Sequence, residues 1–109
     1  MNKAPNKFYP PERVQEKARL ALKYKKRGAK AMTRVGWYRA TQLAKGKGVS
    51  RDIVLRMNSF LKRHENNAVI DDPSKPKWKD RGYVAYIGWG GRPGLVWTQR
   101  LINKYNLKR

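Results

Sequence analysis

Residues 50–65, SRDIVLRMNSFLKRHE, decide the fold because their apolar side chains recur at the spacing of an α-helix. Ser50 has a side chain preferred at a helix N-cap, and Asp52 places a carboxylate in the first turn, where it favours the positive end of the helix dipole. The apolar face that follows consists of Ile53, Val54, Met57, Phe60 and Leu61. A helix with such a face packs against other elements, which the rest of the chain must supply.

Two further helices are predicted upstream of this segment. Residues 11–27 begin with a proline and a glutamate, carry an apolar stripe and end before Gly28. Thr33 is a candidate N-cap for a helix that runs to about Ala44, where the glycines of KGKG, residues 45–48, interrupt the pattern. Together with residues 51–65, this helix predicts a pairing similar to a helix-turn-helix.

The downstream half of the chain predicts a loop and two helices. Turn formers between residues 66 and 80 indicate a long loop, and residues 83–89 favour a short helix. We expect a tight connection over residues 90–94 and a terminal amphipathic helix over residues 95–105.

The length of 109 residues allows one hydrophobic core and one domain. The predicted fold class is all-α: a compact single domain of about five short helices over residues 11–109, preceded by a flexible basic arm over residues 1–10. The predicted aromatic core contains Trp37, Phe60, Trp89 and Trp97.

The charge of the chain indicates a polyanionic partner. Lys and Arg number 27 against 7 Asp and Glu, a formal net charge of +20, and nucleic acid is the obvious polyanion to neutralise such self-repulsion. Twelve basic residues and no acidic one lie between Lys17 and Arg51, and a second, weaker basic region runs from Arg81 to Arg109. The predicted nucleic-acid-binding patch consists of Lys23, Lys25, Lys26, Arg27, Lys30 and Arg34, extended by Lys45, Lys47 and Arg51. The alternative is an ordinary solvated face.

Two parts of this interface have alternative roles. The KGKG segment is either a glycine-rich loop whose amides and lysines cradle a phosphate, or a flexible connection. Trp78 is flanked by Lys75, Lys77, Lys79 and Arg81. Its ring either stacks on a base of a single strand or folds back onto the core to hold the loop in place.

Other classes of function find little support in the sequence. The absence of cysteine excludes disulfides, thiolate zinc sites and a cysteine nucleophile, and no apolar run has the length of a membrane span or the character of a signal peptide. His64 and Glu65, with Asp71, Asp72 and Asp80, are the only cluster from which a metal nuclease could be built; a histidine at a helix end is more often a cap or the partner of a carboxylate. We therefore predict no enzyme activity, no cofactor, no metal and no membrane partner.

Four segments carry a resemblance to a known module: VQEKARLAL (14–22), GWYRATQLAKG (36–46), VSRDIVLRMNSFLKRHE (49–65) and GYVAYIGWGGRPGLVW (82–97). The run from Pro11 to Trp97, about four fifths of the chain, resembles a small module encoded by tailed bacteriophages, alone or fused to virion-associated proteins. The resemblance implies a phage origin and supplies no catalytic residues. This chain departs from the pattern in having Arg92 where related modules carry an acid after WGG, and in being basic throughout.

The leading hypothesis is a phage-encoded, non-enzymatic protein that binds the backbone of DNA, most readily double-stranded DNA, with little sequence preference. One alternative is a minor virion structural or assembly protein that contacts the capsid or other phage proteins and the packaged genome; another is an inhibitor of a host protein with an acidic surface. The expected location is the host cytoplasm during infection or the virion interior, not a secreted form. The sequence leaves open duplex, single strand or RNA, and the oligomeric state.

Overall fold

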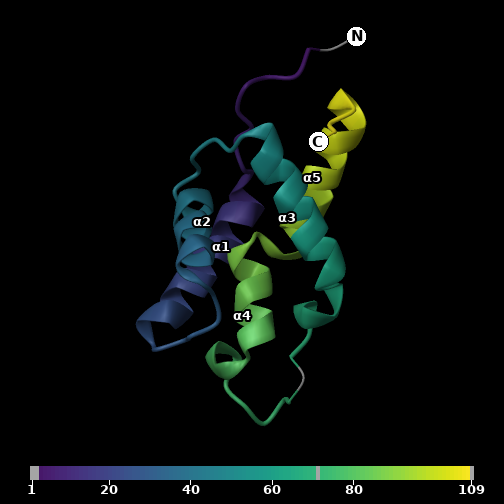
Figure 1. Ribbon diagram of the computed structural model, residues 1–109. Helices are drawn as coiled ribbons and strands as arrows, with labels where there is room; N and C mark the ends of the chain where they lie inside the picture. The colour runs from purple at the N-terminus through teal and green to yellow at the C-terminus, as the bar shows by residue number, and fades with distance from the viewer. Residues whose placement is uncertain (1–2, 71, 109) are drawn as a thin grey trace.

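The computed structural model describes residues 3–70 and 72–108, and over these residues the chain forms five α-helices and two short 3-10 helices (Figure 1). The elements are α1 (Glu12–Lys26), α2 (Arg34–Ala44), α3 (Arg51–Arg63), η1 (Glu65–Ala68), η2 (Lys77–Lys79), α4 (Arg81–Gly88) and α5 (Gly91–Tyr105). The predicted all-α fold is thus confirmed. The predicted long loop contains η1 and η2.

Three helices begin at side-chain caps that satisfy a backbone amide of the first turn. Thr33 Oγ1 accepts a hydrogen bond from the Gly36 amide at 3.2 Å, and Ser50 Oγ accepts one from the Ile53 amide at 3.3 Å. Asp80 Oδ1 accepts from the Tyr83 amide at 3.0 Å, so α4 begins two residues before the predicted start. Short polar side chains at these positions fix where the helices start.

The start of α5 corrects the predicted connection over residues 90–94. Gly90 is the N-cap, with φ +112°, and Gly91, Arg92, Pro93 and Gly94 already belong to the helix. A proline in the first turn lacks only an amide hydrogen that the helix could not have used. Glycine and proline therefore mark a helix start here, and the turn between α4 and α5 is reduced to two residues.

The helices pack as two pairs joined by α4. The α1 and α2 helices pack along one another, α3 packs on α5, and α4 lies between the pairs against α1 (Figure 1). The α1 helix also contacts α5. The predicted helix-turn-helix pairing of α2 with α3 is wrong, because each of these helices buries its apolar face against a different partner.

The core is mainly aliphatic and has two parts. The larger part lies among α1, α2, α3 and α5 and contains Val14, Leu43, Val54, Met57 and Leu61. The smaller part lies mainly between α1 and α4 and contains Ala21, Ala29, Val84 and Ile87. Tyr86 is fully buried, whereas the four rings predicted to form the core, Trp37, Phe60, Trp89 and Trp97, are half-buried and pack against its margins. The aromatic residues therefore surround the core and do not form its centre.

Part of the predicted flexible arm is attached to the domain. Phe8 is 4% exposed, its amide and carbonyl exchange two hydrogen bonds of 2.8 Å with Val49, and its ring lies 5.8 Å from that of Tyr105. Pro10 is buried as well. The arm prediction is wrong for these residues, because an apolar ring in a basic segment has a site on the core to bury in; residues 1 and 2 of the arm lie outside the described residues. The molecule is elongated, with principal extents of 50 × 24 × 22 Å.

Candidate nucleic-acid interface

The first group of predicted residues gathers where α1 ends and α2 begins. We call it the distal cluster; its members Lys23, Lys25, Lys26, Arg27, Lys30 and Arg34 are all exposed. The turn that holds them is a Schellman motif, in which the Ala29 amide donates to the Tyr24 carbonyl at 3.0 Å and the Gly28 amide donates to the Lys25 carbonyl at 2.9 Å. Lys25 Nζ lies 5.3 Å from the centre of the Trp37 ring, a cation–π distance.

Trp78 lies next to the distal cluster, although more than forty residues separate it from α1's last turn in the chain. Its Cζ3 is 4.0 Å from the position that a Cβ would take on Gly28, and Lys79 Nζ lies 5.3 Å from its ring centre. The ring is half-buried against the smaller part of the core. Trp78 therefore holds its loop against the domain, as one of its two predicted roles required, while Lys75, Lys77 and Lys79 of that loop are exposed beside the cluster.

The second group, which we call the proximal cluster, lies at the other end of α2 and consists of Lys45, Lys47 and Arg51, all exposed. The KGKG segment does not form a phosphate cradle there. The Gly46 amide donates to the Leu43 carbonyl at 3.0 Å and the Lys47 amide donates to the Gln42 carbonyl at 3.1 Å, so both amides belong to the C-cap of α2. The two lysine side chains remain available as surface charges.

The fold adds two arginines to the proximal side that the sequence did not indicate. Arg39 of α2 is half-buried, donates through Nη1 to Gln42 Oε1, and has a buried Nε without a hydrogen-bond partner. Burial lowers the pKa of Arg39 from its ordinary value, the neighbouring Tyr38 raises it, and the positive charge of Arg56 on α3 lowers it further. The positive charge of Arg56 therefore acts on the guanidinium group of Arg39, and an anion bound near Arg39 would offset this repulsion.

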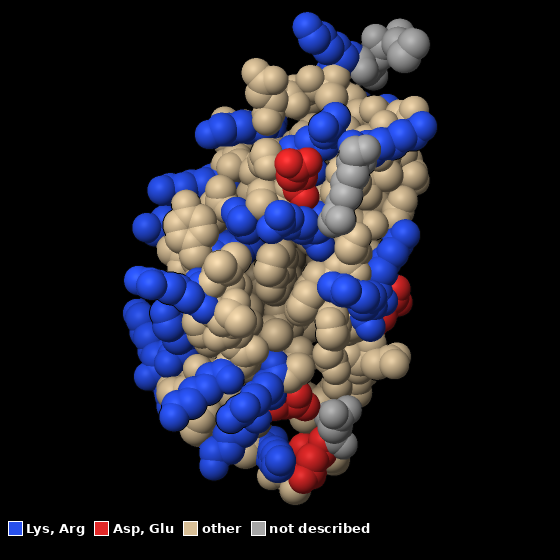
Figure 2. Space-filling model, in the orientation of Figure 1, with Lys and Arg blue, Asp and Glu red and all other residues tan. Residues whose placement is uncertain are grey.

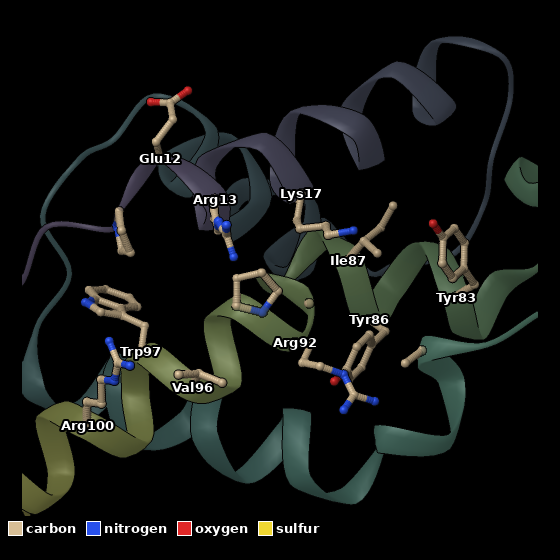
Figure 3. A pocket seen from close by; sticks show the side chains of 14 residues that line it. Glu12, Arg13, Lys17, Tyr83, Tyr86, Ile87, Arg92, Val96, Trp97 and Arg100 are labelled. Carbon is tan, nitrogen blue, oxygen red and sulfur yellow. The ribbon is translucent and has the colours of Figure 1, made fainter.

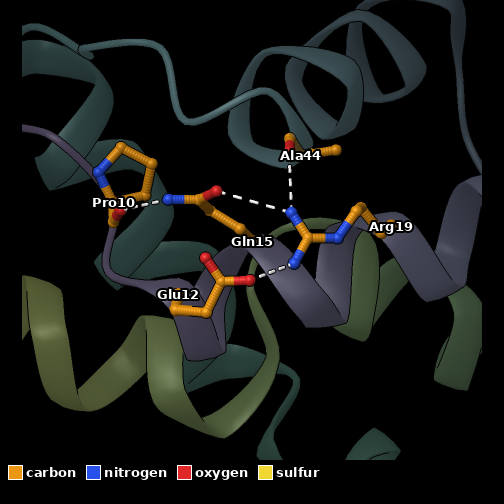
Figure 4. Close-up of polar contacts among 5 residues, drawn as sticks. All are labelled: Pro10, Glu12, Gln15, Arg19 and Ala44. Atoms are coloured by element: carbon orange, nitrogen blue, oxygen red, sulfur yellow. Dashed lines mark hydrogen bonds and ion pairs between the residues drawn. The ribbon is translucent and has the colours of Figure 1, made fainter.

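The α1–α2 pair connects the two clusters and is itself tied together by a cation. Arg19 of α1 forms an ion pair with Glu12 and donates a 3.2 Å hydrogen bond to the Ala44 carbonyl of α2 (Figure 4). Within the described part of the chain, the nine cations of the two clusters have no carboxylate partner within ion-pair distance. Figure 2 shows Lys and Arg side chains along the edge formed by α1 and α2, most densely where α1 ends. The eleven residues of α2 separate the clusters by about 16 Å.

A groove with four cations lies on another side of α1, and the sequence did not predict it. The groove is bounded by α1, α4 and α5 and encloses about 840 Å³. Arg13 and Lys17 reach into it from α1, and Arg92 and Arg100 from α5 (Figure 3). The acid-free run from Arg81 to Arg109 indicated a second basic region, but only the packing of α1 against α5 brings two of its arginines opposite Arg13 and Lys17.

The groove also has one carboxylate, Glu12, which forms an ion pair with Arg19. Most of the other lining side chains are aromatic or apolar, among them Tyr83, Tyr86, Ile87, Pro93, Val96 and Trp97. Tyr86 is 1% exposed, and its buried hydroxyl has no hydrogen-bond partner among the described residues. Figure 3 shows this hydroxyl beside the Arg92 side chain. Burial raises the pKa of Tyr86, Arg92 lowers it and Glu65 raises it, so a cation and a carboxylate both act on the hydroxyl.

His64 occupies the C-cap position of α3, as one of its predicted roles required. Its ring lies 4.4 Å from that of Phe60, and its Nδ1 is 3.4 Å from Asn67 Nδ2. Among the described residues, no group of three or more His, Cys, Asp or Glu side chains converges to hold a metal ion. Asp71, a member of the acidic cluster considered above, lies outside the described residues.

Comparisons with protein-family models, with curated proteins and with solved structures give no match to this chain. Across the residues that the structure covers, none of the helices combines the length and the apolar character needed to cross a lipid bilayer. The arrangement of charges is therefore the main guide to function.

Proposed function

We propose that this chain is a phage-encoded, non-enzymatic protein that binds the phosphate backbone of double-stranded DNA with little sequence preference. The observation that carries the proposal is the pair of exposed cation clusters on the α1–α2 edge, none of whose nine members has a carboxylate partner among the described residues. Phosphate contacts position a protein on DNA without specifying bases. A spacing of about 16 Å corresponds to about five base pairs at 3.4 Å each, so both clusters can contact the same duplex.

The test is fluorescence anisotropy of the purified protein with labelled duplex DNA, titrated at several salt concentrations. If the complex neutralises about six phosphates, log K falls against log salt with a slope of about 5. Charge reversal at three distal residues, Lys25, Lys26 and Arg27, each to Glu, removes three of these contacts and lowers the slope by about 2.7.

A matched control reverses three exposed cations away from the α1–α2 edge: Lys62, Lys104 and Lys108, each to Glu. The net charge changes by the same amount in both triple variants, so only a localised interface distinguishes them. Equal losses of affinity in the two variants contradict an interface on the α1–α2 edge. Weak binding of the unaltered protein at low salt contradicts DNA binding altogether and leaves a protein partner as the explanation of the charge.

Labelled single-stranded DNA and RNA of the same length decide which polymer the edge prefers. A divalent-metal digestion assay tests the non-enzymatic part of the proposal, with His64→Ala as the control. Metal-dependent cleavage that the variant loses contradicts the absence of catalysis.

A second candidate function is that of a minor virion protein that contacts the capsid and the packaged genome. The resemblance of residues 11–97 to modules fused to virion-associated proteins favours it. Mass spectrometry of purified particles distinguishes the two: a virion component is found in the particles, whereas a protein that acts only on intracellular DNA is found in infected cells alone.

A further inference from the structure

The groove between α1 and α5 has the composition of a binding site and lies apart from the two clusters of the proposed duplex interface. Its volume of about 840 Å³ falls in the range of pockets that enclose a ligand. One wall provides Arg13 and Lys17, the other provides Arg92 and Arg100, and aromatic rings lie between them (Figure 3). Cations on both walls and rings between them match a ligand that alternates phosphates with flat apolar groups.

The electrostatics at the start of α5 point to an anion. The helix begins without a side-chain cap and without an acid in its first turn, where the helix dipole is positive. The Lys17 side chain lies over this turn, since its Cγ is 3.2 Å from the position a Cβ would take on Gly91, and Arg92 belongs to the turn itself. Two cations at the positive end of a helix repel it and one another unless an anion lies between them.

The buried Tyr86 hydroxyl is a second, independent indication of a ligand. Buried hydroxyl groups in folded proteins nearly always have a hydrogen-bond partner, and this one has none in the part of the chain that the structure describes. It lies at the Arg92 side of the groove. A phosphate that binds Arg92 lies beside this hydroxyl and accepts its hydrogen bond once a small shift of the covering side chains opens the hydroxyl to the groove.

The spacing of the charges along α5 matches a chain of several nucleotides and is too long for a single phosphate group. Arg92 and Arg100 are eight residues apart, which is about 12 Å along an α-helix and about three to four stacked nucleotides at 3.4 Å each. Trp97 lies between them in sequence and lines the groove, so one base can stack against its indole. Duplex DNA does not offer its base faces to such a ring, because they are stacked within the helix.

From these observations we propose that the groove binds a segment of about three nucleotides of single-stranded nucleic acid. A phosphate lies against Lys17, Arg92 and Tyr86 at one end, a base stacks on Trp97, and a phosphate lies against Arg13 and Arg100 at the other end. This site is distinct from the duplex interface proposed above, and it gives the protein a way to contact a strand end or an unpaired stretch.

The binding test uses an oligothymidylate of about five nucleotides, too short to span the two clusters and the groove together. Two-dimensional NMR resolves the four indole N–H signals, which Trp→Phe variants assign, and circular dichroism verifies that every variant folds. We expect the oligonucleotide to shift the Trp97 signal more than those of Trp37, Trp78 and Trp89. A largest shift at Trp78, beside the distal cluster, overturns the proposal.

Charge removal gives the second readout. The double variant Lys17→Gln with Arg92→Gln loses two phosphate contacts, which lowers the slope of log K against log salt by about 1.4 and weakens binding at 0.1 M salt by about tenfold or more. Lys104→Gln with Lys108→Gln removes the same charge from exposed positions outside the groove and is expected to leave the slope unchanged. Equal effects of the two double variants overturn the proposal.

Two competitor ligands separate the remaining explanations. Thymidine monophosphate offers one base and one phosphate, so it should bind far more weakly than the oligonucleotide; equal affinity shows a mononucleotide pocket and overturns the strand proposal. A hexaglutamate peptide has comparable charge without bases, and equal affinity with the same Trp97 shift assigns the groove to an acidic peptide instead. The groove can be tested apart from the proposed duplex interface. The distal triple variant, with Lys25, Lys26 and Arg27 each changed to Glu, retains all groove residues, so loss of duplex binding does not alter these outcomes.

Discussion

At the level of single residues, the ring of Phe8 attaches the N-terminal segment to the domain. The ring is 4% exposed and lies between Val49, with which its backbone pairs, and Tyr105 near the end of α5. The next residue, Tyr9, is 68% exposed. Two neighbouring aromatic residues therefore differ almost completely in burial, which makes them a matched pair for mutagenesis.

We expect Phe8→Ala to lower the free energy of unfolding by about 3–5 kcal/mol, because it removes a buried ring and leaves a cavity. Tyr9→Ala changes a mostly exposed side chain and should cost less than about 1 kcal/mol. Urea unfolding followed by circular dichroism measures both values. Similar small losses in the two variants contradict the docking of Phe8 and restore the flexible-arm interpretation for that residue.

At the level of elements, the KGKG segment shows how one composition serves two different structures. Glycine and lysine are found both in phosphate-binding loops and at helix C-caps, and here Gly46 has φ +70° and its amide closes the end of α2. The segment therefore stabilises the helix through its backbone, and in the proposed interface it would contribute through the lysine charges alone.

We expect Gly46→Ala to lower the free energy of unfolding by about 1–2 kcal/mol, because alanine resists a positive φ, and to leave the affinity of the folded protein for DNA unchanged. Lys45→Gln with Lys47→Gln should do the reverse: stability is retained, and the slope of log K against log salt falls by about 1.8. Thermal unfolding and anisotropy titration of the same samples provide both readouts. A loss of affinity in the Gly46 variant supports the phosphate cradle against the helix cap.

The helices could be predicted from the sequence because their signals are local. Thr33 and Ser50 satisfy amides three residues away, and the apolar stripe of α3 is contained within its own residues. The partner of each helix is not a local property. Arg92 and Lys17 are 75 positions apart in the chain, and their approach across the groove follows from the packing of α1 on α5, so periodicity alone could not reveal it.

The sequence left open whether Trp78 packs against the domain, and the reason is again that the packing partner is distant in the chain. Its lysine neighbours favoured an exposed ring, and the surface that covers one side of it belongs to α1 and the Gly28 turn. The exposure of the nine predicted cations, by contrast, could be expected, because a lysine or arginine is seldom fully buried without an acid to pair with.

At the level of the whole molecule, the net charge of +20 links stability to binding. Like charges on the α1–α2 edge repel in the free protein, and a bound polyanion removes this repulsion. We expect duplex DNA at a hundred times its Kd to raise the free energy of unfolding by about 2.7 kcal/mol, a gain that shrinks as salt weakens the complex.

Thermal unfolding at a fixed salt concentration measures this gain. Dextran at the same mass concentration is the control for crowding and should contribute less than about 1 kcal/mol. The distal triple variant should lose most of the gain; an undiminished gain in that variant places the stabilising contact elsewhere on the surface.

For the proposed duplex binding, the elongated shape of the molecule limits how densely copies can cover the polymer. A rod of 50 Å laid lengthwise on a duplex occupies about 15 base pairs, whose two strands carry about 30 negative charges. Its own charge of +20 offsets about two thirds of them. A single row of end-to-end copies would thus leave about one third of the polymer's charge, and a filament coated in this way would stay negative and repel its neighbours.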